Sequence, residues 1–344
     1  MSKILVTGGL GYIGSHTVVE LLVAGHDIVI IDNLSNSCEK TLEGIGQACG
    51  LSHYKDLLSF YRVDLRDEPH LNRVFREYDF DCVVHFAACK SVGESMSDPD
   101  KYYDNNVRGT YNLLSAMNTH GVKNLIFSSS CTVYGQADEL PITEQTPIKP
   151  AESVYGRTKQ ICEQMITDMH LGYNYNSMLL RYFNPIGAHE SACIGERPNG
   201  VPDNLIPYVT QTAIGKRDKI TVHGTDYDTP DGTAIRDYIH VVDLARAHAQ
   251  AVETIGKFGE TKFQAEPINL GTGNGYSVKQ VLDAFEKHNN IKLNIEYGPR
   301  RAGDITAAWA DASHADQILG WRAELGLEQM VTSAWRWEQQ NNTE

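Results

Sequence analysis

Long apolar runs, an excess of basic side chains and paired cysteines are all missing from this sequence of 344 residues. No run approaches the roughly 18 apolar residues that cross a bilayer, so a membrane-spanning protein is not expected. The 30 basic side chains are outnumbered by 44 acidic ones, and the net charge of −14 disfavours nucleic acid as a partner, because that surface needs a basic footprint. With 41% hydrophobic and 22% charged residues, the composition excludes a disordered chain, a collagen-like fibre and a coiled coil.

The 7 cysteines are an odd number, and no two of them form a CxxC pair. This usage is typical of a reducing compartment and shows no zinc pattern. The 13 histidines show no metal-ligand spacing with carboxylates or cysteines, so no metal is expected. The opening MSKILVTGG has an apolar run too short for the core of a signal peptide. We therefore expect a cytoplasmic protein.

Short apolar runs alternate with longer amphipathic stretches through the first half of the chain. The runs predicted as buried strands are Lys3–Val6, Asp27–Ile31, Phe60–Val63, Cys82–Phe86, Leu125–Ser128 and Met178–Tyr182. The helices expected between them are Gly14–Ala24, Glu68–Tyr78, Lys101–Asn118 and Ser153–His170. This repetition predicts an α/β fold of Rossmann type, with a doubly wound parallel sheet covered on both faces.

The length predicts about two domains. Between residues 185 and 224, four prolines and five glycines mark loops and short elements. Residues 184–344 are therefore predicted as a smaller α/β substrate domain beside a nucleotide-binding domain of residues 1–183. Segments at about 235–260 are expected to return to the first domain. The later helices expected are Val241–Thr254, Ser277–Lys287 and Leu325–Trp337.

A predicted strand runs directly into a glycine-rich turn and then into a helix. Gly8, Gly11 and Gly14 fit GxxGxxG, and Gly9 with the last two fits GxGxxG. Glycine permits the tight turn and lets the backbone approach a pyrophosphate at the helix N-terminus. Asp32 ends the second strand, where a carboxylate accepts hydrogen bonds from the adenosine ribose and repels a 2′-phosphate. The alternative is a plain turn, but the strand and helix around it favour NAD as cofactor.

Tyr155 and Lys159 are four residues apart in a predicted helix, so they share one face. A free phenol has a pKa of about 10, and lowering it to about 7 takes roughly 4 kcal/mol of preferential stabilisation of the phenolate. A nearby ammonium and an oxidised nicotinamide together supply it. Such pairs are common on solvated helix faces, but this one follows the glycine loop and the strand that ends at Ser130. A serine, a tyrosine and a lysine around a nicotinamide suffice to oxidise a secondary alcohol.

At this point the sequence resembles the extended short-chain dehydrogenases/reductases and, within them, the UDP-glucose 4-epimerase family over nearly the whole chain. Nine matching stretches follow one another in order: VTGGLGYIGSHT, IIDNLSNS, VVHFAACKSVGES, YYDNNVRGT, IFSSSCTVYG, VYGRTK, LLRYFNPIGAH, DGTAIRDYIHVVDLA and RRAGD…WADAS. Nine blocks in order are far more specific than any single motif.

The resemblance implies which residues contact NAD. They are Gly8, Gly11, Tyr12, Ile13 and Gly14 in the loop, Asp32, Asn33, Leu34, Ser35, Asn36 and Ser37 at the adenosine end, Asp64 and Leu65 beside the adenine, and Phe86, Ala87, Ala88, Lys90, Asn105, Ser130, Tyr155, Lys159 and Phe183 along the rest. From the residues alone, Asp64 is equally well explained as a surface carboxylate.

The resemblance also implies the contacts to a UDP-hexose. They are Lys90, Ser130, Tyr155, Asn184, Asn204, Leu205, Thr221, Val222, His223, Arg236, residues 301–304 with Arg301 and Asp304, and Ala308. The two arginines would face the diphosphate, because a guanidinium forks onto its oxygens. The implied reaction is transient oxidation at C4: Tyr155 removes the hydroxyl proton, Ser130 bonds the reacting oxygen, and Lys159 lowers the tyrosine pKa. The 4-keto sugar then turns and is reduced on its other face, so NAD stays bound.

Alternatives of two classes remain: another NAD-dependent nucleotide-sugar epimerase, dehydratase or decarboxylase of the same superfamily, and a non-catalytic NAD-binding sensor. A dehydratase of the same superfamily carries an Asp-Glu pair after the threonine of the serine strand, and a decarboxylase carries a glutamate just before VYG; Cys131-Thr132-Val133-Tyr134 has neither. A non-catalytic NAD-binding sensor commonly loses the tyrosine or the lysine, and this chain has both.

Three further expectations concern single positions and assembly. Ala308 matches the site that sets the room beside the sugar C2 substituent, so N-acetylated UDP-hexosamines are expected as substrates too. Cys131 and His85 are interpreted as packing residues, not as a nucleophile and a ligand. A homodimer through Lys101–Asn118 and the Tyr155 helix is implied by the resemblance only.

Overall fold

The computed structural model describes residues 1–257, 263–301 and 304–341. Seven parallel strands form its central sheet in the order β10-β6-β5-β4-β1-β2-β3. These strands are β1 (Lys3–Thr7), β2 (Asp27–Asp32), β3 (Leu58–Arg62), β4 (Cys82–His85), β5 (Asn124–Ser130), β6 (Asn176–Tyr182) and β10 (Glu266–Leu270).

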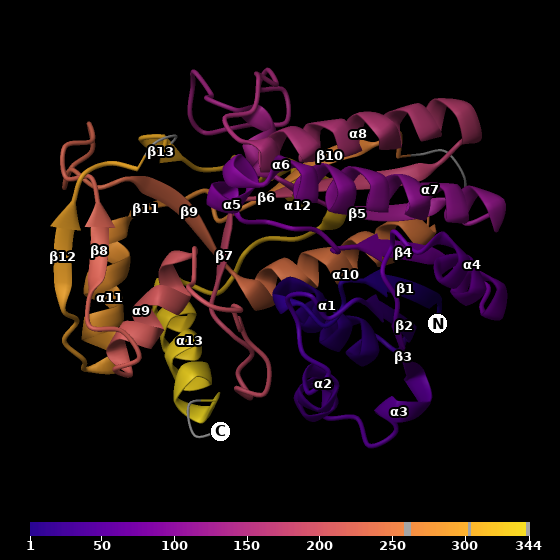
Figure 1. The fold of residues 1–344 in the computed structure, drawn as a ribbon, viewed down its shortest axis with the longest axis horizontal. Helices are drawn as coiled ribbons and strands as arrows, with labels where there is room; N and C mark the ends of the chain where they lie inside the picture. The colour runs from indigo at the N-terminus through magenta and orange to yellow at the C-terminus, as the bar shows by residue number, and fades with distance from the viewer. Residues whose placement is uncertain (258–262, 302–303, 342–344) are drawn as a thin grey trace.

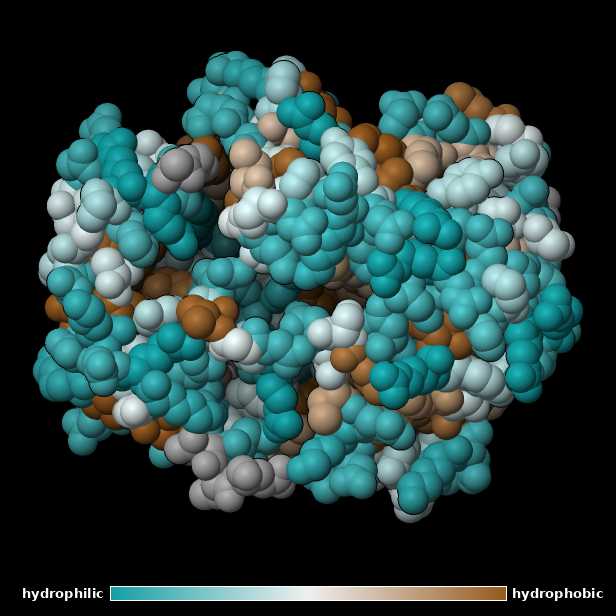
Figure 2. Space-filling view, viewed as in Figure 1, coloured by the Kyte–Doolittle hydropathy of each residue, from teal (hydrophilic) through white to brown (hydrophobic). Residues whose placement is uncertain are grey.

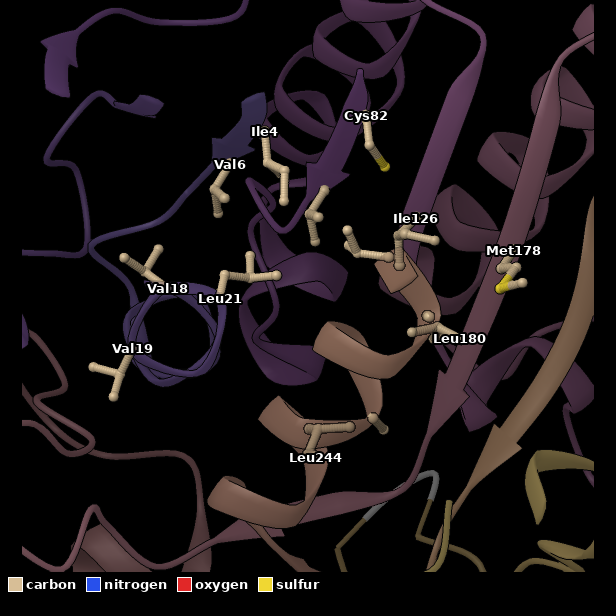
Figure 3. Packing of buried hydrophobic residues seen from close by; sticks show 14 of the residues in the cluster. Ile4, Val6, Val18, Val19, Leu21, Cys82, Ile126, Met178, Leu180 and Leu244 are labelled. Carbon is tan, nitrogen blue, oxygen red and sulfur yellow. The ribbon is translucent and has the colours of Figure 1, made fainter. Parts of the chain in front are cut away.

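Helices cover both faces of this sheet (Figure 1). Alternate side chains of a strand point to opposite faces, so Ile4 and Val6 of β1 join one core and Leu5 joins the other. The first core packs against α1 (Tyr12–Val23), α2 (Thr41–Cys49), α10 (Val241–Lys257) and α12 (Ser313–Leu319). Figure 3 shows part of it, with Val18 and Leu21 of α1 and Leu244 of α10 beside the strand residues.

The second core lies under α4 (Glu68–Glu77), α7 (Gly109–Thr119) and α8 (Val154–Tyr173). The remaining short elements of this half are α3 (Tyr54–Leu57), α5 (Val92–Ser97), α6 (Pro99–Tyr102), a π-helix η1 (Tyr103–Arg108) and a 3₁₀ turn η2 (Cys131–Tyr134). The doubly wound parallel sheet predicted from the alternating pattern is confirmed.

A smaller α/β unit forms the other part of the molecule (Figure 1). One of its sheets has the strands β7 (Asn184–Ile186), β9 (Ile235–His240), β11 (Gly275–Ser277) and β13 (Ala307–Ala308), and the other has β8 (Ile220–His223) and β12 (Ile295–Gly298). Its core contains side chains of α9 (Leu205–Ala213), α11 (Val278–Asn289) and α13 (Leu327–Asn341).

Two features differ from the sequence expectations. The segment Lys101–Asn118, predicted as one helix, is divided into α6, the π-helix η1 and α7. β10 was not among the predicted strands, yet it extends the large sheet beside β6, and α10 packs on the same sheet. Among the described residues, no helix has the length and apolar character needed to cross a membrane.

Candidate functional site

The site is built at the carboxyl edge of the large sheet, where β1 pairs with β2 on one side and with β4 on the other. Chain connections leave this point in opposite directions, which opens a crevice for a ligand. Gly8 follows β1 with a φ of +69°, and a Cβ there would lie 2.7 Å from the Ala87 nitrogen. A Cβ on Gly14 would lie 2.3 Å from the Gly8 oxygen. The loop therefore has no space for side chains at these glycines.

The N-terminus of α1 opens onto this loop. Gly11 is its cap residue, and no side chain caps the helix. The first amides of a helix lack intrahelical acceptors, so they and the helix dipole favour an anion such as a pyrophosphate. Tyr12 and Ile13 begin the helix, and the Tyr12 hydroxyl donates to the Gly187 oxygen at 2.7 Å. These residues fit the NAD pyrophosphate that the sequence predicts.

Asp32 organises the next loop from the end of β2. Its carboxylate is 7% exposed and accepts hydrogen bonds from the Leu10 amide at 3.1 Å, the Leu34 amide at 2.9 Å and the Ser37 hydroxyl at 2.7 Å. One carboxylate thus joins the glycine loop to residues 33–37, including Ser35 and Asn36. This places the predicted adenosine-binding residues next to the predicted pyrophosphate loop.

Asp64 is held by ion pairing. Arg66 donates to both of its oxygens at 2.9 and 2.8 Å, and Asn33 donates to Oδ2 at 2.9 Å. The Arg66 guanidinium holds the pKa of Asp64 well below its usual range. Leu65 beside it is buried, and its oxygen accepts from Asn112 at 3.0 Å. Asp64 therefore lies in a charge pair next to the Asn33 loop.

The tyrosine and the lysine lie on α8, whose N-terminus is capped by the Ser153 hydroxyl accepting from the Gly156 amide at 3.1 Å. Lys159 is buried, and its ammonium group donates to the backbone carbonyl oxygen of Ser128 at 2.7 Å. Its Nζ lies 6.0 Å from the centre of the Tyr155 ring. The predicted pair is therefore brought together on one helical face, against the end of β5.

Ser130 ends β5 and completes the group. Its hydroxyl oxygen accepts from the Thr132 amide at 3.2 Å and from the Thr132 hydroxyl at 3.0 Å. Burial raises the pKa of Tyr155 above its ordinary value, whereas a hydrogen bond with Ser130 lowers it. Burial also lowers the pKa of Lys159 to about 8. The tyrosine thus needs further positive charge beside it to act as a base near neutral pH.

The π-helix η1 places two asparagines beside the loop after β4. Asn105 donates to the Asn106 oxygen at 2.9 Å. Asn106 is buried, accepts from the Cys89 amide at 2.8 Å, and donates to the Cys89 oxygen at 3.0 Å and to Thr158 at 3.1 Å. Asn106 therefore joins α8 to the segment that carries Phe86, Ala87, Ala88 and Lys90.

The predicted sugar-binding residues come from several elements of the smaller unit. The predicted NAD contact Phe183 and the predicted sugar contact Asn184 follow β6, and Asn184 pairs with Tyr238 of β9. Asn204 is the cap residue of α9, and Leu205 begins that helix. The predicted residues Thr221, Val222 and His223 form most of β8, in the separate two-stranded sheet with β12. The face seen in Figure 2 is hollowed between this side and the side over α5.

Arg236, Arg301 and Asp304 form one charged group. Arg236 Nη2 lies 3.6 Å from an Asp304 oxygen, and Arg301 Nε donates to the other at 3.0 Å. Ala308 on β13 is in register with Arg236 on β9. The predicted positions 302–303 lie outside the described residues.

Ala308 is 3% exposed and packs in a cluster with Tyr134 and Phe183. Its methyl group therefore faces the same region as the predicted NAD contact Phe183. A larger side chain at 308 would displace these aromatic rings or narrow the space beside them.

The two expected packing residues have the environments of packing residues. His85 is buried, with Thr7 at 2.6 Å from Nδ1 and Thr110 at 3.0 Å from Nε2. Burial raises the pKa of Cys131 to about 12, which opposes formation of the nucleophilic thiolate.

Sequence reasoning missed two acidic residues beside these positions. Asp237 is fully buried next to Arg236 and accepts four hydrogen bonds, from the amide and hydroxyl of Thr272 and from the amides of Gly273 and Ala310. Glu196 accepts from both Lys90 and Asn204. Asp237 lies inside a motif that was noticed, but nothing in the local pattern around Glu196 indicates these partners.

Comparisons with known proteins agree over the whole chain. A family described as GDP-mannose 4,6 dehydratase matches residues 5–334. The UDP-glucose 4-epimerase of Bacillus subtilis is 49% identical over 339 residues, covering 98% of this chain and 97% of the relative. The human UDP-glucose 4-epimerase is 47% identical over 346 residues, with 98% and 97% covered.

Solved structures give the same result. A crystal structure of UDP-glucose 4-epimerase from Bifidobacterium longum in complex with NAD+ and UDP matches with a TM-score of 0.93 and 46% identity, covering 99% of both chains. The Stenotrophomonas maltophila enzyme, with bound NAD and formylated UDP-arabinopyranose, has a TM-score of 0.93 and 43% identity over 100% and 99% of the two chains.

Proposed function

The chain belongs to the UDP-glucose 4-epimerase family of extended short-chain dehydrogenases/reductases, and we propose that it interconverts UDP-galactose and UDP-glucose with NAD as a bound prosthetic group. The observation that carries this proposal is the placement of Tyr155, Lys159 and Ser130 at one point of the sheet edge. The glycine loop and Asp32 lie along the same edge, where they fit a dinucleotide. When bound, NAD supplies a reversible hydride acceptor for C4 of the sugar.

The chain's own residues move and hold a proton at the 4-hydroxyl. Tyr155 takes that proton on its phenolate oxygen and returns it after the sugar has turned. Ser130 bonds the reacting oxygen and keeps it near the tyrosine. Lys159 contributes a fixed positive charge, held in place by the Ser128 oxygen, which favours the phenolate. The reaction thus needs one proton site that is used in both directions.

Arg236 and Arg301 are proposed to hold the diphosphate around which the sugar turns. Their guanidinium groups converge on Asp304, so neither is a freely solvated side chain. A diphosphate would be bound at its oxygens by the forks of the two arginines. The sugar itself would need few fixed contacts, because it has to present either face to the same proton site.

The test is conversion of UDP-galactose by the purified protein with no NAD added, followed by NMR. Formation of UDP-glucose establishes both the epimerase reaction and retained cofactor. A 4-keto-6-deoxy product would instead show a dehydratase, and absence of any product with NAD supplied would favour the sensor. The missing carboxylates at residues 131–134 argue against the dehydratase.

We also propose that UDP-N-acetylglucosamine and UDP-N-acetylgalactosamine are substrates. The support is the small Ala308 side chain, which packs in the cluster of Tyr134 and Phe183 and takes up less space there than a large side chain would. Ala308→Tyr should abolish turnover of the N-acetylated sugars while retaining turnover of UDP-galactose. Absence of UDP-N-acetylglucosamine turnover by the unmodified protein would contradict this proposal.

We also propose a homodimer and a cytoplasmic location. Tyr103 and Tyr111, 38% and 53% exposed, lie on the helical stretch expected to pair between subunits. All 7 cysteines are free, which suits a reducing compartment. Light scattering of the purified protein tests the dimer, and a monomer mass would overturn it. Cell fractionation tests the location.

A further inference from the structure

Residues 188–204, here termed the strap, run from β7 to α9 of the smaller unit and contact the nucleotide-binding unit. In Figure 1 the chain after β7 runs between α13 and the helices α1 and α2. On the side of α13, Trp337 donates to the backbone carbonyl oxygen of Glu196 at 3.1 Å, and Arg336 donates to that of Glu190 at 3.0 Å. The strap is therefore attached to the smaller unit.

On its opposite side the strap packs Ile194 into the first core of the nucleotide-binding unit and makes several further contacts there. Asn199 donates to the backbone carbonyl oxygen of Ser35 at 3.1 Å, and the Glu196 carboxylate forms an ion pair with Lys90 at 2.8 Å. Gly44 of α2 lies against the Cys193 oxygen so closely that a Cβ would be 2.4 Å from it. Ser35 and Lys90 belong to two different parts of the proposed NAD site, the adenosine loop and the loop after β4. The strap therefore spans the mouth of that site.

Glu196 is the point where the two binding regions meet. Its side chain is 11% exposed, and the same oxygen accepts from Lys90 and, at 2.7 Å, from Asn204. Lys90 is a proposed NAD contact and Asn204 a proposed nucleotide-sugar contact at the start of α9. A carboxylate beside proposed contacts of two anionic ligands repels both of them, so its benefit has to come from the groups that it holds.

We propose that Glu196 is a positioning residue that fastens the strap over bound NAD and links retention of the cofactor to occupancy of the nucleotide-sugar site. This rests on the proposed function, because it takes NAD to be the bound cofactor. Release of NAD requires the Lys90–Glu196 pair to open, together with the Asn199–Ser35 bond. When a uridine diphosphate binds Asn204, the Asn204 amide no longer donates to Glu196. The carboxylate oxygen of Glu196 is then shared with no other donor than Lys90, which strengthens the ion pair that holds the strap over NAD.

The experiment measures the rate at which purified holoenzyme loses NAD after dilution, by timed spin filtration and enzymatic assay of the NAD that stays with the protein. Glu196→Gln keeps the size and one acceptor oxygen but removes the charge that pairs with Lys90. We expect NAD release to be about tenfold faster, the effect of losing one charge-assisted bond. Asn199→Ala, at an exposed position, should also speed release and is a second variant that leaves all charges in place.

Glu190→Gln is the matched control. It removes the same charge from the same strap, yet the exposed Glu190 side chain makes no hydrogen bond or ion pair within the described parts of the chain. This variant should lose NAD at the wild-type rate. If Glu190→Gln accelerates release as much as Glu196→Gln does, net charge rather than the specific pair is responsible and the proposal is wrong.

A second measurement separates positioning from a general loosening of the fold. UDP alone should slow NAD release from the wild-type protein and from Glu190→Gln, and it should have no effect on Glu196→Gln. An equal UDP effect in all three would overturn the link through Glu196. Wild-type protein that neither retains nor binds NAD would overturn the proposed function, whereas retention that is unchanged in Glu196→Gln overturns this inference alone.

Discussion

Tyr155 is the residue on which the proposed chemistry depends, because no other described hydroxyl combines a bond to Ser130 with a neighbouring buried lysine. Tyr155→Phe removes one oxygen and leaves the ring packing in place. We expect kcat to fall about 10²–10⁴-fold, the contribution of a positioned proton-transfer group. The amount of NAD that copurifies and the affinity for UDP should stay at wild-type values. Steady-state kinetics with an NAD assay checks this, and a variant with near wild-type kcat would show that the proton is moved elsewhere.

Asp237 is the residue whose contribution to stability is expected to be largest near the site. Its buried carboxylate accepts four hydrogen bonds. An asparagine at this position has only one acceptor oxygen, and its NH2 group would face hydrogen-bond donors instead of acceptors. Asp237→Asn should lower the free energy of unfolding by about 1–3 kcal/mol. Asp283→Asn, which removes an exposed pair with Lys279, should stay within about 0.5 kcal/mol. Urea unfolding of both variants makes the comparison, and equal losses would contradict the assigned role.

At the scale of elements, the predicted glycine loop and helix α8 agree closely with the structure, whereas the region of η1 does not. The spacing of apolar residues and the presence of turn residues are local signals, and they are enough to predict a strand, a glycine turn and an amphipathic helix. The π-helix depends on Asn106 reaching the Cys89 backbone and Thr158, which lie far away in sequence. No local pattern reports such partners. The same limit explains why β10, a short strand after a long excursion, was missed.

The start of α1 gives a prediction for a whole element. A methyl group on Gly14 would meet the Gly8 oxygen at 2.3 Å, and this contact is with backbone that has to hold the pyrophosphate loop. Gly14→Ala should cost about 1–3 kcal/mol of stability and abolish copurification of NAD. Gly93→Ala in α5 is the control, because nothing lies within 4 Å of its added methyl group and alanine favours a helix. Thermal unfolding and NAD content are the readouts, and Gly14→Ala protein with full NAD would refute the fit.

At the scale of the whole molecule, the residues along the sheet edge could be predicted, but their links across the two units could not. The alternating pattern indicates a parallel sheet, and a parallel sheet places the ends of β1, β4 and β5 at one edge. Glu196 and Asp237, however, act through partners that only the packing of the smaller unit brings near. The sugar-binding residues were likewise predicted from the family resemblance and not from local patterns, because they come from several elements of the smaller unit.

Buried histidines give the whole molecule a common response to acid. Burial lowers the pKa of His16 and His85 to about 3 and that of His240 and His248 to about 4. An unfolded imidazole has a pKa of about 6.5, so between pH 6.5 and 4 the unfolded chain binds protons that the folded chain excludes. The free energy of unfolding should therefore decrease as pH falls through this window, by up to about 1.4 kcal/mol per pH unit for each histidine.

His248→Phe isolates one of these four contributions. Its Nε2 has no hydrogen-bond partner among the described residues, and its ring packs against Phe86, so an apolar ring suits the position. Urea unfolding at pH 6.5, 5.5 and 5.0 should show the slope of stability against pH reduced by up to about 1.4 kcal/mol per unit relative to wild type. Acidic groups with lowered pKa values, such as Asp64, act at lower pH, and those whose pKa burial raises, such as Asp243, contribute equally to both proteins. Equal slopes for the two proteins would mean that this ring takes up protons as readily in the folded state as in the unfolded chain, and burial of His248 would then not contribute to acid sensitivity.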